Sequence, residues 1–119
     1  MGTQFDPKKT KINEDTFADW LREPIQASLQ QVPGIGPAAE KLLAEPADAA
    51  EEKIETTHQL IGKFLTMKGA DVTPVEHCDM FFTWLGERGI KVHKHTIVNA
   101  IAEKCEVFVP GVYDAAAYL

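Results

Sequence analysis

The stretch that decides the fold is LQQVPGIGPAAEKLL, residues 29–43. Leu29 and Val32 are spaced three apart, which places both side chains on one face of a short helix. The Pro-Gly pair that follows ends this helix, and Pro37 is typical of the first turn of another, where a missing N–H removes no hydrogen bond. The pattern therefore predicts two short helices joined by a tight turn.

The turn itself consists of two glycines around one isoleucine. Gly34 and Gly36 supply backbone angles, or a close approach of two segments, that a side chain would obstruct. We expect Ile35 between them to point inward and hold the turn in place. The small side chains of Ala38 and Ala39 allow the second helix to lie close to the first. Together these features are the signature of a helix-hairpin-helix motif.

A turn of this kind leads into a helix N-terminus, where unpaired N–H groups and the positive end of the helix dipole attract anions. We expect the amides of Gly34, Gly36, Ala38 and Ala39 to donate to a phosphate, and Lys41 to add charge one turn later. Such contacts read no base, so the motif predicts nucleic-acid binding without sequence preference. The alternatives are a turn that joins two packed helices without a ligand, and a hairpin reused for protein contacts.

The rest of the chain shows helical periodicity and no convincing alternation of the kind that strands require. Asn13 or Asp15 can cap the first helix, and Thr73-Pro74 with Glu76 is typical of another helix start. Besides the hairpin, we expect helices over residues 13–22, 53–67, 74 to between 86 and 89, and 92–107. The predicted fold class is all-α, with five to six helices and one hairpin.

The length of 119 residues suits a single domain with its own core. The first residues are polar and rich in lysine, and Pro110-Gly111 ends the last predicted helix. We therefore expect a flexible N-terminal arm over residues 1–12, one helical domain over residues 13–109, and a C-terminal tail over residues 110–119.

The cysteine count and hydropathy indicate the compartment. Cys78 and Cys105 lie in apolar helical surroundings, which is typical of buried thiols in a reducing compartment. No apolar run approaches the ~18 residues that a membrane span requires. The first six residues contain no apolar stretch suited to a signal peptide. We expect a nuclear or cytoplasmic protein that does not contact membranes.

The net charge of −6 is unusual for a nucleic-acid binder, because lysine and arginine neutralise phosphates. The acidic residues are concentrated, however: residues 40–55 hold six of them and only two lysines. Lys63, Lys91 and Lys94 lie in stretches whose charge balance is positive. We therefore include these three lysines in the candidate DNA-binding surface, together with the hairpin residues Gly34, Ile35, Gly36, Ala38, Ala39 and Lys41.

Four histidines and two cysteines raise the question of a metal site. A structural zinc site takes ligands in pairs at short spacing from two places in the chain. His77 and Cys78 are adjacent, so their side chains diverge on a helix, and the chain has no Cys-X-X-Cys. No serine, cysteine or threonine has an identifiable base and orienting partner. We expect no metal, no cofactor and no enzymatic activity.

His93 and His95 follow Lys91 at the start of the last predicted helix. We expect both histidines to lie in a solvated polar turn beside Lys91 and Lys94. In that setting they would gain charge below neutral pH and strengthen the binding of anions.

Further motifs occur in the order seen in the barrier-to-autointegration factor (BAF) family, and over Thr16 to Phe108 the chain resembles that family. The motifs are WLREP at 20–24, the hairpin, LIGKFLTMK at 60–68 and FTWL at 82–85. The resemblance implies a compact SAM-like and BAF-like helical homodimer that binds double-stranded DNA without sequence preference and can bridge duplexes. It also implies phosphate contacts by the hairpin amides of Gly34, Gly36, Ala38 and Ala39, with Lys94 as the lysine of the last helix.

Two positions depart from the family pattern. The family's N-terminal lysine falls on Thr16, and an arginine of its last helix falls on Ile97. The acidic stretch Glu45 to Glu55 is longer and more negative than the family's connection. Together with the net charge, these departures favour an alternative function: a protein–protein interaction adaptor that keeps the fold and binds DNA weakly or not at all.

Overall fold

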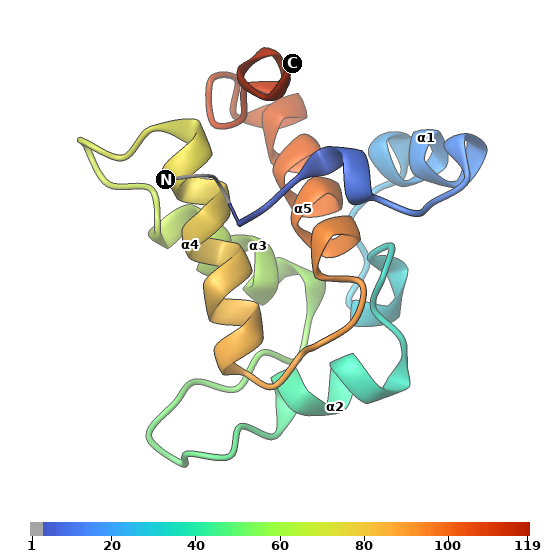
Figure 1. Ribbon diagram of the computed structural model, residues 1–119. Helices are drawn as coiled ribbons and strands as arrows, with labels where there is room; N and C mark the ends of the chain where they lie inside the picture. The colour runs from blue at the N-terminus through green and yellow to red at the C-terminus, as the bar shows by residue number, and fades with distance from the viewer. Residues whose placement is uncertain (1–3) are drawn as a thin grey trace.

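Five α-helices and three short 3-10 turns form the fold in the computed structural model, which describes residues 4–119 (Figure 1). The elements are η1 (Pro7–Lys9), α1 (Glu14–Arg22), η2 (Leu29–Gln31), α2 (Pro37–Ala44), α3 (Thr57–Thr66), α4 (Pro74–Glu87), α5 (Lys94–Phe108) and η3 (Ala115–Tyr118). Residues 4–119 contain no strand, so the all-α prediction is confirmed. Within the same residues, no helix is both long and apolar enough to cross a bilayer.

The last helix, α5, lies at the centre of the fold. α1, α3, α4 and η1 all pack against it, and Figure 1 shows α4 and α1 on opposite sides of it. Every residue from Thr96 to Ala102 is buried, as expected for a helix that is covered on all its faces. Because α1, α3, α4 and η1 share this one helix as a packing partner, α5 fixes their positions relative to one another.

Two helix starts have the caps that the sequence predicts. The Asn13 side chain accepts hydrogen bonds from two first-turn amides of α1. Thr73 accepts from the amide of Glu76, whose carboxylate accepts in return from the Thr73 amide, and Pro74 occupies the first helical position of α4. Caps of this kind satisfy amides that the helix itself leaves unpaired. The cap predictions at Asn13 and Thr73 are confirmed.

The acidic connection between α2 and α3 is longer than predicted. The sequence pattern predicts a helix from Lys53, but α3 begins at Thr57. The reason lies in two local contacts. The amide of buried Ile54 donates to the carbonyl of Leu43 at 2.9 Å, which holds the loop against the end of α2. Thr56 then forms a capping box with Gln59, and this box sets the start of the helix.

Aromatic side chains of α3 and α4 fill the core beside α5. The rings of Phe64 and Phe81 meet edge to face with centroids 5.1 Å apart, and Phe81 stacks on Trp84 at 5.7 Å. His77 is fully buried, and its Nε2 donates to the carbonyl of Phe64 at 2.6 Å. Burial lowers the pKa of His77, so this ring is part of the core in its neutral form.

Both cysteines are buried thiols, as predicted. Cys78 belongs to α4 and Cys105 to α5. Burial raises the pKa of each thiol to about 12, because a thiolate loses its hydration in these apolar surroundings. Each side chain therefore acts as a small apolar residue of the core.

The N-terminal segment differs from the flexible arm predicted over residues 1–12, of which residues 1–3 lie outside the described part of the chain. Phe5 is fully buried, and its ring meets the ring of Tyr118 at 5.5 Å. Residues 4–12 are packed on α4 and α5 because a single aromatic side chain anchors a stretch that is otherwise polar. Amides of Phe5, Asp6 and Lys11 donate to Asp79, His95 and Thr96 respectively.

The C-terminal tail predicted over residues 110–119 is also part of the folded domain. Val112 and Tyr113 are buried, and the Glu106 carboxylate accepts hydrogen bonds from the amides of Gly111 and Tyr113. The tail then ends in η3, whose Tyr118 covers the buried N-terminal phenylalanine. The two ends of the described chain therefore pack against each other.

Replacing Phe5 with alanine tests the packed N-terminal segment. The variant loses a buried ring and leaves a cavity, so we expect Phe5→Ala to lower the free energy of unfolding by about 3 kcal/mol in urea denaturation. Lys8→Ala changes an exposed neighbour in the same segment and should alter that free energy by less than about 0.5 kcal/mol. Equal stability of Phe5→Ala and the parent protein would show that the segment is detached.

Candidate nucleic-acid interface

The first half of the predicted hairpin is shorter than a helix. η2 is a single 3-10 turn from Leu29 to Gln31, capped by the Ser28 hydroxyl. The segment before it is held by the Gln31 side chain, which accepts from the Gln26 amide at 2.7 Å and donates to the Pro24 carbonyl at 2.8 Å. These two bonds keep the segment between Pro24 and η2 out of a helix. The hairpin in this protein is therefore a single 3-10 turn followed by α2.

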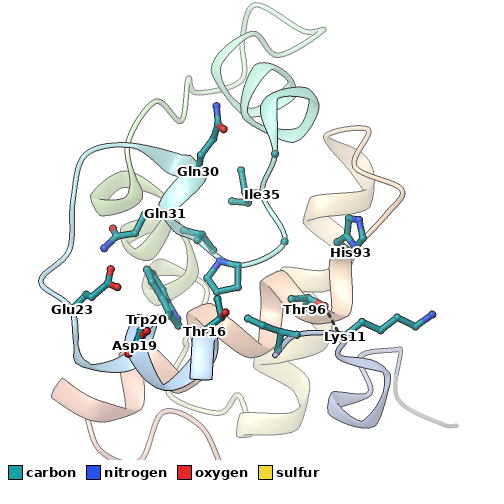
Figure 2. A pocket seen from close by; sticks show the side chains of 15 residues that line it. Lys11, Thr16, Asp19, Trp20, Glu23, Gln30, Gln31, Ile35, His93 and Thr96 are labelled. Atoms are coloured by element: carbon teal, nitrogen blue, oxygen red, sulfur yellow. Dashed lines mark hydrogen bonds between the residues drawn. The ribbon is translucent and has the colours of Figure 1, made fainter. Parts of the chain in front are cut away.

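The turn after η2 lies directly against the start of α5, where Figure 2 shows Ile35 and His93 on neighbouring segments. Gly34 adopts a positive φ of 94°. A Cβ atom on Gly34 would lie 2.9 Å from Cγ1 of Ile97 and 3.3 Å from the His93 carbonyl oxygen. Both the backbone angle and the close approach therefore require glycine at this position.

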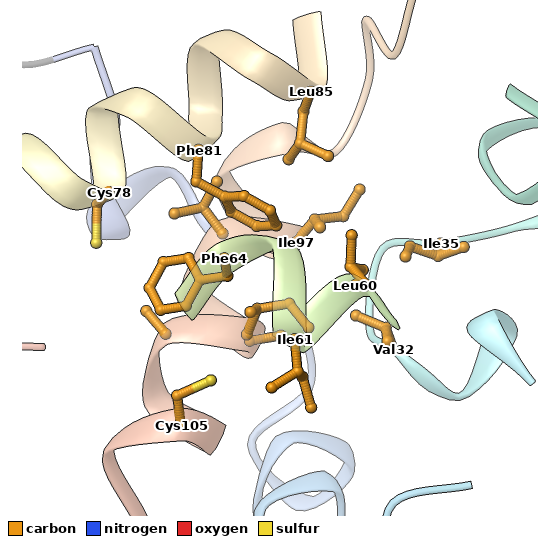
Figure 3. Packing of buried hydrophobic residues seen from close by; sticks show 14 of the residues in the cluster. Val32, Ile35, Leu60, Ile61, Phe64, Cys78, Phe81, Leu85, Ile97 and Cys105 are labelled. Carbon is orange, nitrogen blue, oxygen red and sulfur yellow. The ribbon is translucent and has the colours of Figure 1, made fainter. Parts of the chain in front are cut away.

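Two apolar side chains anchor the hairpin in the core. Val32 is 1% exposed and Ile35 is 5% exposed, and Figure 3 shows both reaching from the hairpin toward Leu60 of α3. The Ile35 amide donates to the Val32 carbonyl at 3.0 Å. The inward orientation predicted for Ile35 is confirmed. Its amide is already bonded, so Ile35 shapes the turn and offers no donor to a ligand.

The amides that follow the turn are available. Gly36 is the N-cap of α2 and provides no side-chain acceptor, and Pro37 has no N–H. Within residues 4–119, no protein group accepts a hydrogen bond from the amides of Gly36, Ala38 or Ala39. A Cβ on Gly36 would meet nothing within 4 Å. This group of three amides, which we call the amide edge, is the open N-terminus of an eight-residue helix.

One carboxylate belongs to the first turn of α2. Glu40 is half-buried, and its Oε1 accepts a hydrogen bond from Nε2 of Gln30 at 3.0 Å. This contact holds the carboxylate toward η2. It also stabilises α2, because a negative charge in the first turn complements the helix dipole.

A groove of about 570 Å³ runs beside the turn, between the hairpin, α1 and the start of α5. Lys11 and His93 lie at one end of it, and Asp19 and Glu23 lie at the other (Figure 2). Gly34 and Gly36 contribute to its wall. The groove is therefore electrically divided, and its basic end adjoins α5.

The lysines that the sequence analysis assigned to the site are not all brought to it. Lys41 and Lys91 are exposed, and Nζ of Lys94 lies over the Phe82 ring of α4 at 4.5 Å. Lys63 forms an ion pair with Glu52 of the acidic connection between α2 and α3 (residues 45–56), which we call the acidic loop, with Nζ and Oε1 2.6 Å apart. The structure does not bring Lys63 to the hairpin as a free charge. Lys11 lines the groove, although the sequence pattern did not mark it as a candidate binding residue.

Two further basic side chains serve the fold itself. Arg88 is 5% exposed and donates to the last carbonyls of α2, at Leu42 and Leu43. Lys104 is 4% exposed and donates to the carbonyls of Trp20 and Glu23 at the end of α1. Basic groups stabilise the negative ends of helices in this way. Both belong to the positively charged stretch of residues 86–104, which also holds Lys91 and Lys94. Neither Arg88 nor Lys104 is available to a ligand.

The two histidines near α5 have different surroundings. His93 is exposed, has a positive φ of 62° and is the N-cap of α5. His95 is half-buried, and its Nδ1 accepts a hydrogen bond from the Asp6 amide at 3.1 Å. Desolvation, followed by the charge of Lys9, lowers the pKa of His95. The prediction of a solvated turn is thus wrong for His95, which holds the N-terminal segment as a neutral ring.

Within the described residues, no group of three or more histidine, cysteine, aspartate or glutamate side chains is placed to hold a metal ion. At the end of the groove that adjoins α5, the groups suited to a ligand are therefore backbone amides, Lys11 and His93. These groups donate hydrogen bonds or carry positive charge, which suits an oxyanion such as phosphate.

A pair of alanine substitutions tests the different roles of the two glycines. Gly34→Ala must adopt a left-handed backbone and push Ile97 away, so we expect a loss of about 2–4 kcal/mol in the free energy of unfolding. Gly36→Ala has an extended backbone and open space, and the change should stay within about 1 kcal/mol. Thermal or urea unfolding measures both, and equal losses would contradict the close approach at Gly34.

Comparison with known proteins adds no assignment: no family model, no curated protein and no solved structure matches this chain. The candidate interface is therefore defined by its own geometry, which is an amide edge beside a groove with one basic end.

Proposed function

We propose that this protein is a non-enzymatic module that binds the backbone of double-stranded DNA without reading its sequence. The observation that carries the proposal is the amide edge of Gly36, Ala38 and Ala39, which has no acceptor within residues 4–119. Unpaired amides at a helix N-terminus bind phosphate oxygens through hydrogen bonds and the helix dipole. Lys11 and His93 add basic groups to the adjoining groove.

The nature of these donors favours the backbone over the bases. Amides of a turn offer the same geometry to every phosphate, whereas base recognition needs side chains that reach the edges of bases in a groove. The large aromatic residues Phe64, Phe81 and Trp84 are buried and cannot stack on bases. Binding should therefore differ little between duplexes of different composition.

A second copy of the chain would strengthen this binding. One hairpin makes few phosphate contacts, and two hairpins on a dimer raise the avidity when both engage the same DNA molecule. The resemblance to the barrier-to-autointegration factor family supports a homodimer that bridges two duplexes. Such a protein would act where duplex DNA is found, in the nucleus or the cytoplasm.

The second candidate function is that of a protein–protein adaptor. It is favoured by the way in which basic side chains are used: Lys63 is paired with Glu52, and Arg88 and Lys104 are buried. Asp19 and Glu23 also place negative charge at the far end of the groove. An adaptor would keep the same hairpin as a structural element and show little affinity for duplex DNA at any salt concentration.

Substitutions at Ala38 separate the two candidates. Ala38 is exposed at the second position of α2, so Ala38→Glu should preserve the helix, because an acid there complements the dipole. The new carboxylate repels phosphate, and we expect the dissociation constant for duplex DNA at about 50 mM salt to rise at least about tenfold. Fluorescence anisotropy with two duplexes of different composition measures this change.

Ala38→Gln is the matched control, since glutamine has the size of glutamate without its charge. We expect this variant to bind within about threefold of the parent protein, which is under about 1 kcal/mol. If the parent protein leaves duplex DNA unbound even at low salt, or if the glutamate variant binds as well as the glutamine variant, the DNA-binding proposal is wrong.

A further inference from the structure

The N-terminal segment is fixed to the body of the protein at several points. Oδ1 of Asp79 accepts from the Phe5 amide at 2.9 Å. Nδ1 of His95 accepts from the Asp6 amide at 3.1 Å, and Oγ1 of Thr96 accepts from the Lys11 amide at 3.2 Å. The η1 turn lies between the second and third of these anchors. Its two lysines are therefore held in a defined place beside α5.

A hollow of about 590 Å³ lies between this segment and the start of α5. Every titratable side chain that lines it is a lysine or a histidine, and no carboxylate contributes to its wall. The nearest acid along the chain is Asp6, whose Oδ1 accepts from the Lys8 amide at 2.9 Å and so caps η1. The lining residues are Lys8, Lys9, Lys11, Val92, His93, His95 and Thr96.

This basic hollow adjoins the groove beside the hairpin. Lys11, His93 and Thr96 line both of them. A path of hydrogen-bond donors and positive charge therefore leads from the amide edge, past the start of α5, to the exposed side chains of Lys8 and Lys9. One phosphate would occupy only part of this path, whereas the strand of a duplex presents a charge about every 3.4 Å along its axis.

We infer that residues 8–11, which we call the lysine clasp, form a second phosphate-binding site that takes the backbone next to the phosphate held at the amide edge. This inference rests on the proposed function and specifies how the same ligand is bound. The clasp is ordered before the ligand arrives, so binding loses little of the conformational freedom that a flexible lysine tail would lose. It also brings to the site three lysines that the sequence analysis left outside the candidate DNA-binding surface.

The test replaces Lys8 and Lys9 together with glutamine. Both side chains are exposed and the bonds of their backbone are unchanged, so the thermal unfolding of this double variant should match that of the parent protein. Each phosphate contact contributes about 0.9 to the slope of log K against log salt, so the slope should decrease by about 2 when both contacts are lost. The measurement is fluorescence anisotropy with duplex DNA between about 50 and 200 mM salt.

Lys53→Glu is the matched control, because it changes the net charge by the same amount at an exposed position of the acidic loop, which Figure 1 shows far from η1. The salt slope of this variant should equal that of the parent protein. If Ala38→Glu weakens binding but the double variant keeps the full slope, or if the control loses as much as the double variant, the lysine clasp is wrong and the hairpin site stands. If the parent protein binds no duplex, both proposals fail.

Discussion

The close approach between Gly34 and the start of α5 places the hairpin beside the basic end of the groove. Because Gly34 has no Cβ, the turn can lie against Ile97 and the His93 carbonyl. From that position Ile35 enters the core, and Gly36 opens α2 toward the outside. A side chain at Gly34 would separate the hairpin from α5. The amide edge and the basic end of the groove would then no longer adjoin.

The distribution of charge explains how a chain of net charge −6 can present a basic surface. Two basic residues, Arg88 and Lys104, neutralise helix ends inside the fold, and Lys63 is paired with the acidic loop. Of the remaining lysines, three lie close together at and just after the η1 turn, where Lys8, Lys9 and Lys11 line a hollow beside His93. Local field, more than total charge, determines where a polyanion binds. The acidic loop lies at another part of the molecule (Figure 1).

Local patterns predict those parts of the fold that depend on local chemistry. The caps at Asn13 and Thr73, the inward position of Ile35 and the need for glycine at Gly34 follow from short stretches of sequence. The all-α class follows from helical periodicity over most of the chain. By contrast, η2 is limited to one turn by side-chain bonds of Gln31, which no propensity scale contains.

Contacts between distant residues could not be predicted in the same way. Phe5 is a single aromatic residue in a polar stretch, and the residue that binds its amide, Asp79, is 74 positions away in sequence. The burial of Arg88 against the end of α2 is equally non-local. For this reason local patterns predict a flexible N-terminal segment where the structure has a packed one, and they do not reveal that Arg88 and Lys104 are buried.

The most direct test of this account is a titration of the isotope-labelled full chain with duplex DNA, followed through the backbone amide resonances. We predict the largest chemical-shift changes at Gly36, Ala38 and Ala39, with smaller changes along residues 8–11 and at His93. Shifts concentrated on the acidic loop or around Trp84, with the hairpin amides unchanged, would contradict it.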